Sequence, residues 1–253
     1  MPIMYTVGVR HRYRIRDISH QLFVTVLCCS LVWNLFMNLR LLLLLTFFSP
    51  LLHATSYFLE LKDLAEKEDA TAEQQLDIAF RYDNGLGVTE NNYEASNWYL
   101  KAAKRGNATA QFNLAIMYLN GEGLPIDELE ALRWFRSAAE QGDSAAQARM
   151  GYIYTKGQGV PVDIAEAMRW YTKVAKQGDP DAQNALGYIY AKGQGTAADN
   201  IKAYIWWTLS EAQGNQQAAR GIDTISLLMS KQQIQEAQRL TIKCFNSEQQ
   251  DCY

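Results

Sequence analysis

Few residues in this chain of 253 residues have the types and spacing that catalysis needs. Its three histidines, His11, His20 and His53, all precede residue 54, so the rest of the chain has no imidazole base and no histidine metal ligand. No serine has a lysine three positions after it, which is the arrangement that penicillin-recognising enzymes use to activate a nucleophile. We therefore expect no enzyme, and no catalytic, cofactor-binding or metal-binding residues.

Two cysteines, Cys244 and Cys252, lie close together near the C-terminus. In an oxidising compartment a disulfide between them would hold the C-terminal tail against the helix predicted before it. The alternative is that both thiols are free or pair with another molecule.

The N-terminal segment has the layout of an export signal. Residues 37–56 begin with Met37 and Arg40, continue as an apolar stretch, and end in small residues at which cleavage after Ala54 or Ser56 would fit. Residues 1–36 would then be a mis-assigned upstream extension, with translation starting at Met37. The competing interpretation is an uncleaved membrane anchor whose preceding arginines stay cytoplasmic. Both interpretations predict export, to the bacterial periplasm or else to the medium or the outer side of the inner membrane.

The charge of the chain also changes if this segment is removed. The full chain has a net charge of −3, whereas residues 57–253 hold 19 basic and 26 acidic residues, a net charge of −7. An acidic domain is a poor ligand for nucleic acid or anionic lipid. We expect no nucleic-acid partner, and membrane contact only through an uncleaved N-terminal segment.

The central part of the chain is a sequence repeat. Four units of 36 residues, 73–108, 109–144, 145–180 and 181–216, align without a gap. In the second unit the recurring residues include Tyr118, Gly121, Ala131, Trp134 and Gly142. Twelve of the sixteen glycines occupy three aligned positions. A phosphate-binding loop needs a strand before it, so these glycines are better explained as turns that end a helix in each repeat.

Each unit predicts two helices. Apolar residues at helical spacing, such as Leu114 and Tyr118, form the buried stripe of a first helix of about three turns. Asp127 is typical of the N-cap of a second helix, and Asp143 of the first helix of the next unit. One such pair cannot bury its own apolar face, so the pairs must stack. The fold class is therefore all-α, and we expect a right-handed α-solenoid with its tryptophans in the core.

Both ends of the repeat array need a cap. A capping helix is predicted within 57–72, and it carries apolar residues at amphipathic spacing: Tyr57, Phe58, Leu61, Leu64 and Ala65. Residues 217–253 are predicted to form capping helices and a tail. Ser230 and Gln233 have the spacing of a capping box at the start of the last helix.

The repeat resembles the Sel1-like repeat family, a relative of the tetratricopeptide repeat. The resemblance rests on Leu-Gly-x-x-Tyr-x-x-Gly-x-Gly, Asp-x-x-x-Ala-x-x-Trp-Tyr and Ala-x-x-Gly patterns, and the third unit is nearest to the consensus. It implies a stacked helical fold and a role in scaffolding, envelope signalling or host contact. Some Helicobacter members are described as β-lactamases, but their repeats carry paired cysteines and these repeats have none.

We expect a non-catalytic, monomeric adaptor that binds a protein or peptide on the concave face formed by the first helices. The candidate partner-binding residues lie on three successive first helices: Phe112, Asn113, Arg149, Tyr152, Asn184 and Tyr188. Two alternatives stay open, a secreted factor that engages host proteins and a protein that binds or hydrolyses cell-wall material or β-lactams.

Overall fold

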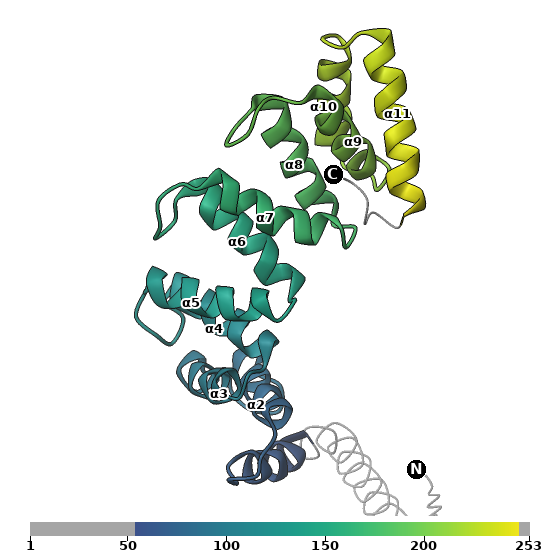
Figure 1. Cartoon of the computed structure of the whole chain (residues 1–253). Coiled ribbons are helices and arrows are strands. Elements are labelled where there is room, and N and C mark those ends of the chain that lie inside the picture. Colours follow the sequence, from purple (N-terminus) through teal and green to yellow (C-terminus); the bar gives the residue numbers. More distant parts are fainter. Residues whose placement is uncertain (1–53, 248–253) are drawn as a thin grey trace, which may run out of the picture. The chain divides into compact units, whose positions relative to one another are not determined.

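The computed structural model describes residues 54–247 (Figure 1). Residues 1–53 and 248–253 lie outside this range, so the predicted upstream extension, nearly all of the signal segment, and Cys252 lie outside it too. Within the described range every regular element is a helix, and the all-α fold is confirmed. The compact unit begins at Phe58. The right-handed sense of the stack stays a prediction.

The helices alternate between a first and a second helix of each repeat. The first helices are α2 (Ala72–Asn84), α4 (Ala108–Asn120), α6 (Ser144–Lys156), α8 (Pro180–Lys192) and α10 (Gln216–Ser226). The second helices are α3 (Asn92–Lys104), α5 (Glu128–Glu140), α7 (Ile164–Ala175) and α9 (Asn200–Glu211), and α11 (Lys231–Asn246) ends the described chain. Since the first helices start 36 residues apart, the predicted period is confirmed.

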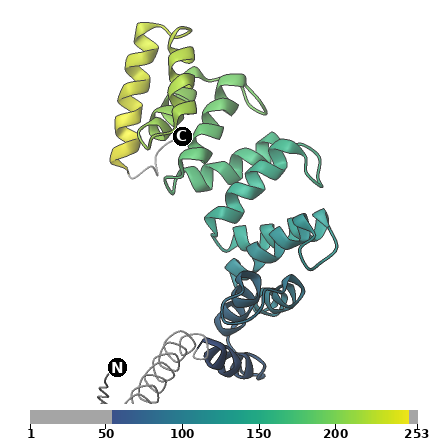
Figure 2. The same ribbon diagram turned by 180° about the vertical axis from the view of Figure 1, so that it is seen from behind.

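Each helix packs mainly on the helices that precede and follow it along the chain (Figure 2). The last helices depart from this order, because α10 also contacts α8 and α11 packs on α9. The core is therefore a continuous row of small clusters, in which alanines such as Ala95, Ala131 and Ala203 lie beside large rings and are fully buried. Stability in such an array comes from each repeat and its contacts with neighbours.

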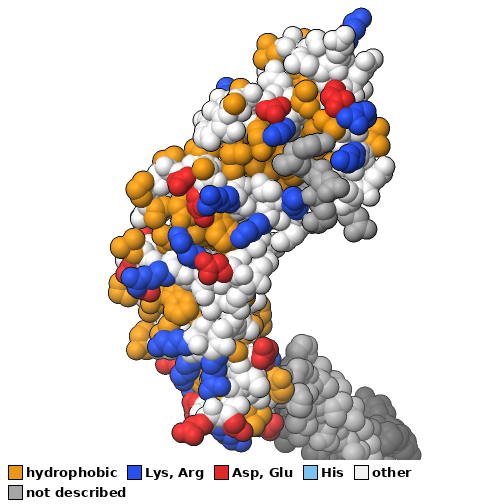
Figure 3. Space-filling view, in the orientation of Figure 1, with side chains coloured by type: hydrophobic (Ala, Val, Ile, Leu, Met, Phe, Trp, Pro, Cys, Tyr) orange, Lys and Arg blue, Asp and Glu red, His pale blue; other side chains and the backbone are white. Residues whose placement is uncertain are grey.

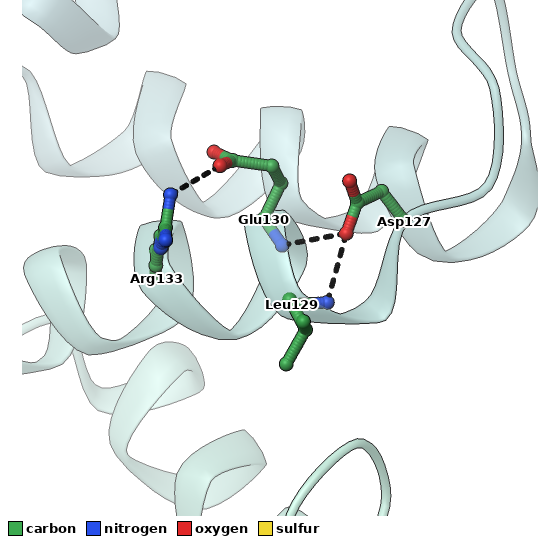
Figure 4. A network of polar contacts seen from close by, with 4 residues as sticks. All are labelled: Asp127, Leu129, Glu130 and Arg133. Carbon is green, nitrogen blue, oxygen red and sulfur yellow. Dashed lines mark hydrogen bonds and ion pairs between the residues drawn. The ribbon is translucent and has the colours of Figure 1, made fainter.

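The helix starts are fixed by side chains that accept hydrogen bonds from free backbone N–H groups. At the start of α5 one carboxylate oxygen of Asp127 accepts from the N–H of Leu129 and of Glu130, both at 3.0 Å (Figure 4). One turn later Glu130 pairs with Arg133. The predicted caps at Asp127 and Asp143 are confirmed, and so is the capping box at Ser230.

The aligned glycines end the first helices and allow close backbone contact. Gly121 is the left-handed C-cap of α4, with φ of 74°. Gly123 also has a positive φ of 69°, and a Cβ built on it would lie 2.2 Å from the carbonyl oxygen of Asn92 in the preceding repeat. Gly142 has φ of 96°, but nothing lies within 4 Å of its Cβ position. Gly123 therefore has two reasons to be glycine and Gly142 has one.

We predict that Gly123→Ala destabilises the chain by more than about 3 kcal/mol, because left-handed backbone strain adds to a collision with backbone atoms. Gly142→Ala, the matched control, carries the left-handed strain alone and should cost about 1–2 kcal/mol. Urea unfolding of both variants followed by circular dichroism measures the difference. Equal costs would show that the Gly123 loop moves aside freely.

The tryptophan column is a core feature in three repeats of four. Trp98, Trp170 and Trp206 are buried, as predicted, whereas Trp134 is half-buried. Lysine side chains cover the outer faces of two of them, with Lys101 Nζ 3.6 Å from the ring centroid of Trp98 and Lys173 Nζ 4.0 Å from that of Trp170. These cation–π contacts explain how large rings near the surface are shielded.

A helix packs on the array at each of its two ends. Residues 54–65 are helical and bury Phe58, Leu61 and Ala65, whereas Tyr57 and Leu64 are exposed. The helix therefore ends before the predicted limit at residue 72, and two of the five predicted apolar residues face solvent. At the other end α11 buries Ala237 and Cys244 against the last repeat.

Candidate partner-binding face

A row of large apolar side chains runs along the solvent side of the first helices. Its members occupy the same repeat position on α2, α4, α6 and α8, namely Phe80, Ile116, Tyr152 and Tyr188. The three aromatic members are exposed to 47%, 40% and 44% of their surface, and Ile116 is half-buried. We call these four residues the first-helix row. Solvent-exposed rings at regular spacing are typical of an interaction surface.

Tyr152 is the best-supported member of the row, because two cations flank its ring. The Arg149 guanidinium carbon lies 5.5 Å from the centroid of the Tyr152 ring and 5.8 Å from that of Phe135, and Lys156 Nζ lies 5.9 Å from the Tyr152 ring. Arg149 Nε is buried and has no hydrogen-bond partner among the described residues. The cluster thus presents a ring and two positive charges, a combination that favours contact with a protein surface.

The other candidates from the sequence differ in accessibility. Phe112 is half-buried and packs edge-on against Phe135, with centroids 5.5 Å apart. Asn113 is half-buried and forms a hydrogen bond with the hydroxyl of Tyr99. Both are therefore partly used by the fold. Tyr152 and Tyr188 are exposed, and Arg149 is half-buried like Phe112 and Asn113 but lies beside the exposed Tyr152 ring.

Asn184 does not lie on the exposed face, where the sequence predicted it. It is only 8% exposed, because the helix α10 lies over α8 and its Nδ2 donates to Gln217 Oε1 at 3.3 Å. A first helix in the middle of the array lacks this additional cover. Asn184 therefore offers little surface to a partner, and Phe80 and Ile116 replace it as members of the face. Phe80 and Ile116 could have been identified from the sequence, because they occupy the same position of the repeat as Tyr152 and Tyr188.

A column of buried glutamines positions the first helices and was not foreseen. Gln147 donates through Nε2 to the carbonyl of Ala139, near the end of the preceding helix α5, at 3.0 Å, and its Oε1 accepts from Gln177 at 3.2 Å. The same pair of bonds recurs in the neighbouring repeats at Gln111 and Gln183. Each glutamine gives a helix-terminal carbonyl a second hydrogen bond, beside the one that the carbonyl accepts from the backbone N–H of the aligned glycine, such as Gly142. The column therefore holds each first helix against the end of the previous repeat.

A second column joins first and second helices within a repeat. The Tyr99 hydroxyl donates to Asp83 at 3.1 Å, and the hydroxyls of Tyr171 and Thr155 hydrogen-bond one another. Burial is the main cause that raises the pKa of Tyr99 and of Asp83 above their ordinary values. These groups are inside the stack and serve its packing.

The described residues contain no group of three or more histidine, cysteine or acidic side chains that could hold a metal ion. Among residues 54–247 no helix is both long enough and apolar enough to span a bilayer. The face shown in Figure 3 mixes basic, acidic and hydrophobic side chains, and a continuous basic field of the kind that binds a phosphate backbone is not seen on it.

Cys244 is fully buried in the cluster that joins α11 to the last repeat. Its predicted partner Cys252 lies outside the described residues, so the disulfide stays a prediction. We expect the purified chain to gain about 2 mass units when it is treated with a reductant under denaturing conditions, one hydrogen for each sulfur of a reduced bond. An unchanged intact mass would contradict the disulfide.

The chain matches one protein family and several solved structures. The model of the Sel1 repeat matches residues 75–107, 108–143, 144–179 and 180–215. A Sel1 repeat protein from Oxalobacter formigenes is 35% identical, over 68% of this chain and 72% of that one, with a TM-score of 0.62. No curated protein sequence matches the chain.

A second similar structure is a protective antigen with an SLR fold, present in uropathogenic Escherichia coli strains. It is 37% identical, with a TM-score of 0.58, over 60% of this chain and 32% of that one, so the chain spans about a third of its length.

Sel1 repeat proteins are generally non-catalytic scaffolds for protein–protein interaction. The matched repeats cover more than half of the chain, and their limits coincide closely with the starts of the helices α4, α6, α8 and α10. The chain belongs to the Sel1 repeat family.

Proposed function

We propose that this protein is a non-catalytic adaptor that binds a partner protein through the first-helix row. The observation that carries the proposal is the repetition of an exposed ring or branched side chain at one position on four successive first helices. The fold does not require rings there, because the buried stripe of each helix already supplies its packing, as Leu114, Met150 and Leu186 show.

The type of partner follows from the chemistry of the row. Tyrosine and arginine are the residues that most often dominate binding energy at protein interfaces. Tyr152 and Tyr188 belong to the row, Arg149 lies beside Tyr152, and residues 57–253 are acidic overall. A protein or a peptide therefore fits the face better than a nucleic acid or an anionic membrane. We expect the chain itself to be monomeric.

The export signal predicted at residues 37–56 supports a location in the bacterial periplasm. Fractionation of the producing cell tests it, with an N-terminal sequence that begins at Thr55 or Tyr57 as the expected result. A mature protein that still contains residues 10–16 would support the membrane anchor instead.

A second candidate function is supported by one comparison. The similar protein from uropathogenic Escherichia coli is a protective antigen, and an antigen that protects must be accessible to the host. On that ground the chain could act outside the cell by engaging host proteins. Detection of the protein in culture medium together with capture of a host protein through the same face would favour this function.

The experiment that tests the adaptor role compares capture by two chains. Wild-type protein should retain one stoichiometric partner from an envelope extract, and Arg149→Glu with Tyr152→Ala should lose it while keeping its melting temperature. A matched control on the second helices, Arg169→Glu with Tyr93→Ala, should keep the partner. Capture by all three chains would contradict the proposal, and so would turnover of a chromogenic β-lactam by the pure protein.

A further inference from the structure

A cavity opens beside the last member of the first-helix row. It has a volume of about 330 Å³ and is lined mainly by residues of α8, α9 and α10: Tyr188, Ala191, Lys192, Trp207, Arg220 and Leu228. Leu228 follows α10 and is 70% exposed. The cavity therefore joins an apolar wall to two cationic side chains.

A comparison of equivalent positions explains why space is left there. In three repeats the aromatic residue of the second helix has a sizeable neighbour from the first helix: Tyr99 bonds to Asp83, Tyr171 bonds to Thr155, and Phe135 lies in one apolar cluster with Leu119. In the fourth repeat the residue is Trp207 and the equivalent neighbour is Ala191. The side chain of Ala191 is too small to fill the space that the larger residue occupies in the other repeats, and it has no polar atom.

Trp207 forms a rigid apolar wall of the cavity. A Cβ built on Gly187 would lie 2.5 Å from its ring, and one built on Gly221 would lie 2.6 Å from it, so the indole is held closely between two helices. Tyr188 packs edge-on against it, with centroids 5.3 Å apart and an interplanar angle of 87°. The indole Nε1 is buried and has no hydrogen-bond partner among the described residues.

The charges at the cavity have one sign. Lys192 and Arg220 both line it, and no acidic side chain does. Within residues 54–247 neither cation takes part in an ion pair. An occupant that carries a carboxylate would therefore meet two cations that form no ion pair with the described part of the chain, and an apolar group next to that carboxylate would meet Trp207 and Leu228.

We infer that the cavity binds a peptide segment of the partner in which an acidic residue stands next to a large aliphatic one. The carboxylate pairs with Lys192 and Arg220 at the rim, and the aliphatic side chain packs against Tyr188, Trp207 and Leu228. Since Nε1 of Trp207 has no exposed surface, the carboxylate is assigned to the two cations and not to the indole. The inference rests on the proposed function, because Tyr188 belongs to both sites, and it adds the chemistry of the bound segment.

Calorimetric titration of the purified chain with acetyl-Ala-Leu-Asp-Leu-Ala-amide tests the assignment. We expect saturable binding that weakens about tenfold when aspartate in the peptide is replaced by asparagine, and about tenfold in the variant Lys192→Gln with Arg220→Gln. Binding should be unchanged in the control Lys231→Gln with Lys243→Gln, which removes two exposed charges from α11. Sodium chloride at 0.5 M should weaken the binding as well.

Several results would overturn the inference: no binding of the aspartate peptide, equal binding of the two peptides, or saturation of the cavity by inorganic phosphate alone. Concentration-dependent dimerisation that the Lys192→Gln, Arg220→Gln variant abolishes would assign the cavity to a second copy of the chain and would also overturn it. None of these results affects partner capture through Arg149 and Tyr152. Failure of this inference is therefore distinguishable from failure of the adaptor role.

Discussion

Replacement of Gln147 by leucine should destabilise the protein by about 2–3 kcal/mol, although leucine is apolar and similar in size. The side chain is 4% exposed, and its amide satisfies the carbonyl of Ala139 and the amide of Gln177. Leucine would remove both of these hydrogen bonds, each worth about 0.5–1.5 kcal/mol, and would leave the Ala139 carbonyl with only the backbone N–H of Gly142. Loss of the contact between two repeats adds to that cost.

Urea unfolding monitored by circular dichroism measures this effect. The matched control is Gln177→Ala, which removes the outer of the two bonds from an exposed residue and should cost less than about 1 kcal/mol. If Gln147→Leu were as stable as the wild-type chain, the glutamine column would not hold the repeats together. Gln147→Glu is a further comparison, because it keeps the shape but replaces the donating amide by an acceptor.

Replacement of Tyr152 and Tyr188 by alanine should weaken binding of the captured partner by at least about 100-fold. Each ring is exposed and lies in the centre of the first-helix row or beside the cavity, and truncation of a central aromatic residue typically costs 2 kcal/mol or more, about a 30-fold loss of affinity. The fold should be little affected, because neither ring belongs to the buried clusters.

Surface plasmon resonance with the purified partner gives the affinities, and thermal unfolding gives the stability. Tyr93→Ala is the control, because Tyr93 is 61% exposed but lies on the second helix α3. An affinity that falls equally for Tyr93→Ala and for the double variant would place the contact on the wrong face. Loss of binding together with a lower melting temperature would show that the rings act through the fold.

Much of the fold could be predicted because the repeat displays each structural requirement four times. Aspartate or asparagine at one aligned position identifies an N-cap, and glycine at another identifies a helix end, since few other residues suit those backbone geometries. Asp127 and Gly121 are examples, and both are as predicted. A single unit would have left the same residues ambiguous.

The binding face was harder to predict because accessibility depends on the ends of the stack. Asn184 has the sequence features of a surface residue, but α10 covers it, and nothing in its own repeat shows that. Gln147 was not identified from the sequence, since a glutamine is usually exposed and its role depends on a carbonyl at the end of the preceding helix. Both residues take part in contacts between repeats, which a pattern within one repeat does not encode.

Exposed apolar residues also occur on the second helices and on the loops before them, including Ile126, Leu129 and Val162. Two apolar surfaces therefore compete for the role of binding face. The first-helix row is distinguished by its regular position, one residue in each of four repeats, and by the cations beside Tyr152 and Tyr188. A direct test must compare both surfaces in the living cell.

Site-specific photocrosslinking makes that comparison. A benzophenone amino acid is placed in turn at Phe80, Ile116, Tyr152 and Tyr188, and at Tyr93, Leu129 and Val162 as controls, and the cells are irradiated. The adaptor account predicts that the positions of the first-helix row give a crosslink to one common protein and that the control positions give none. Crosslinks to a common protein from the control positions alone would contradict the account.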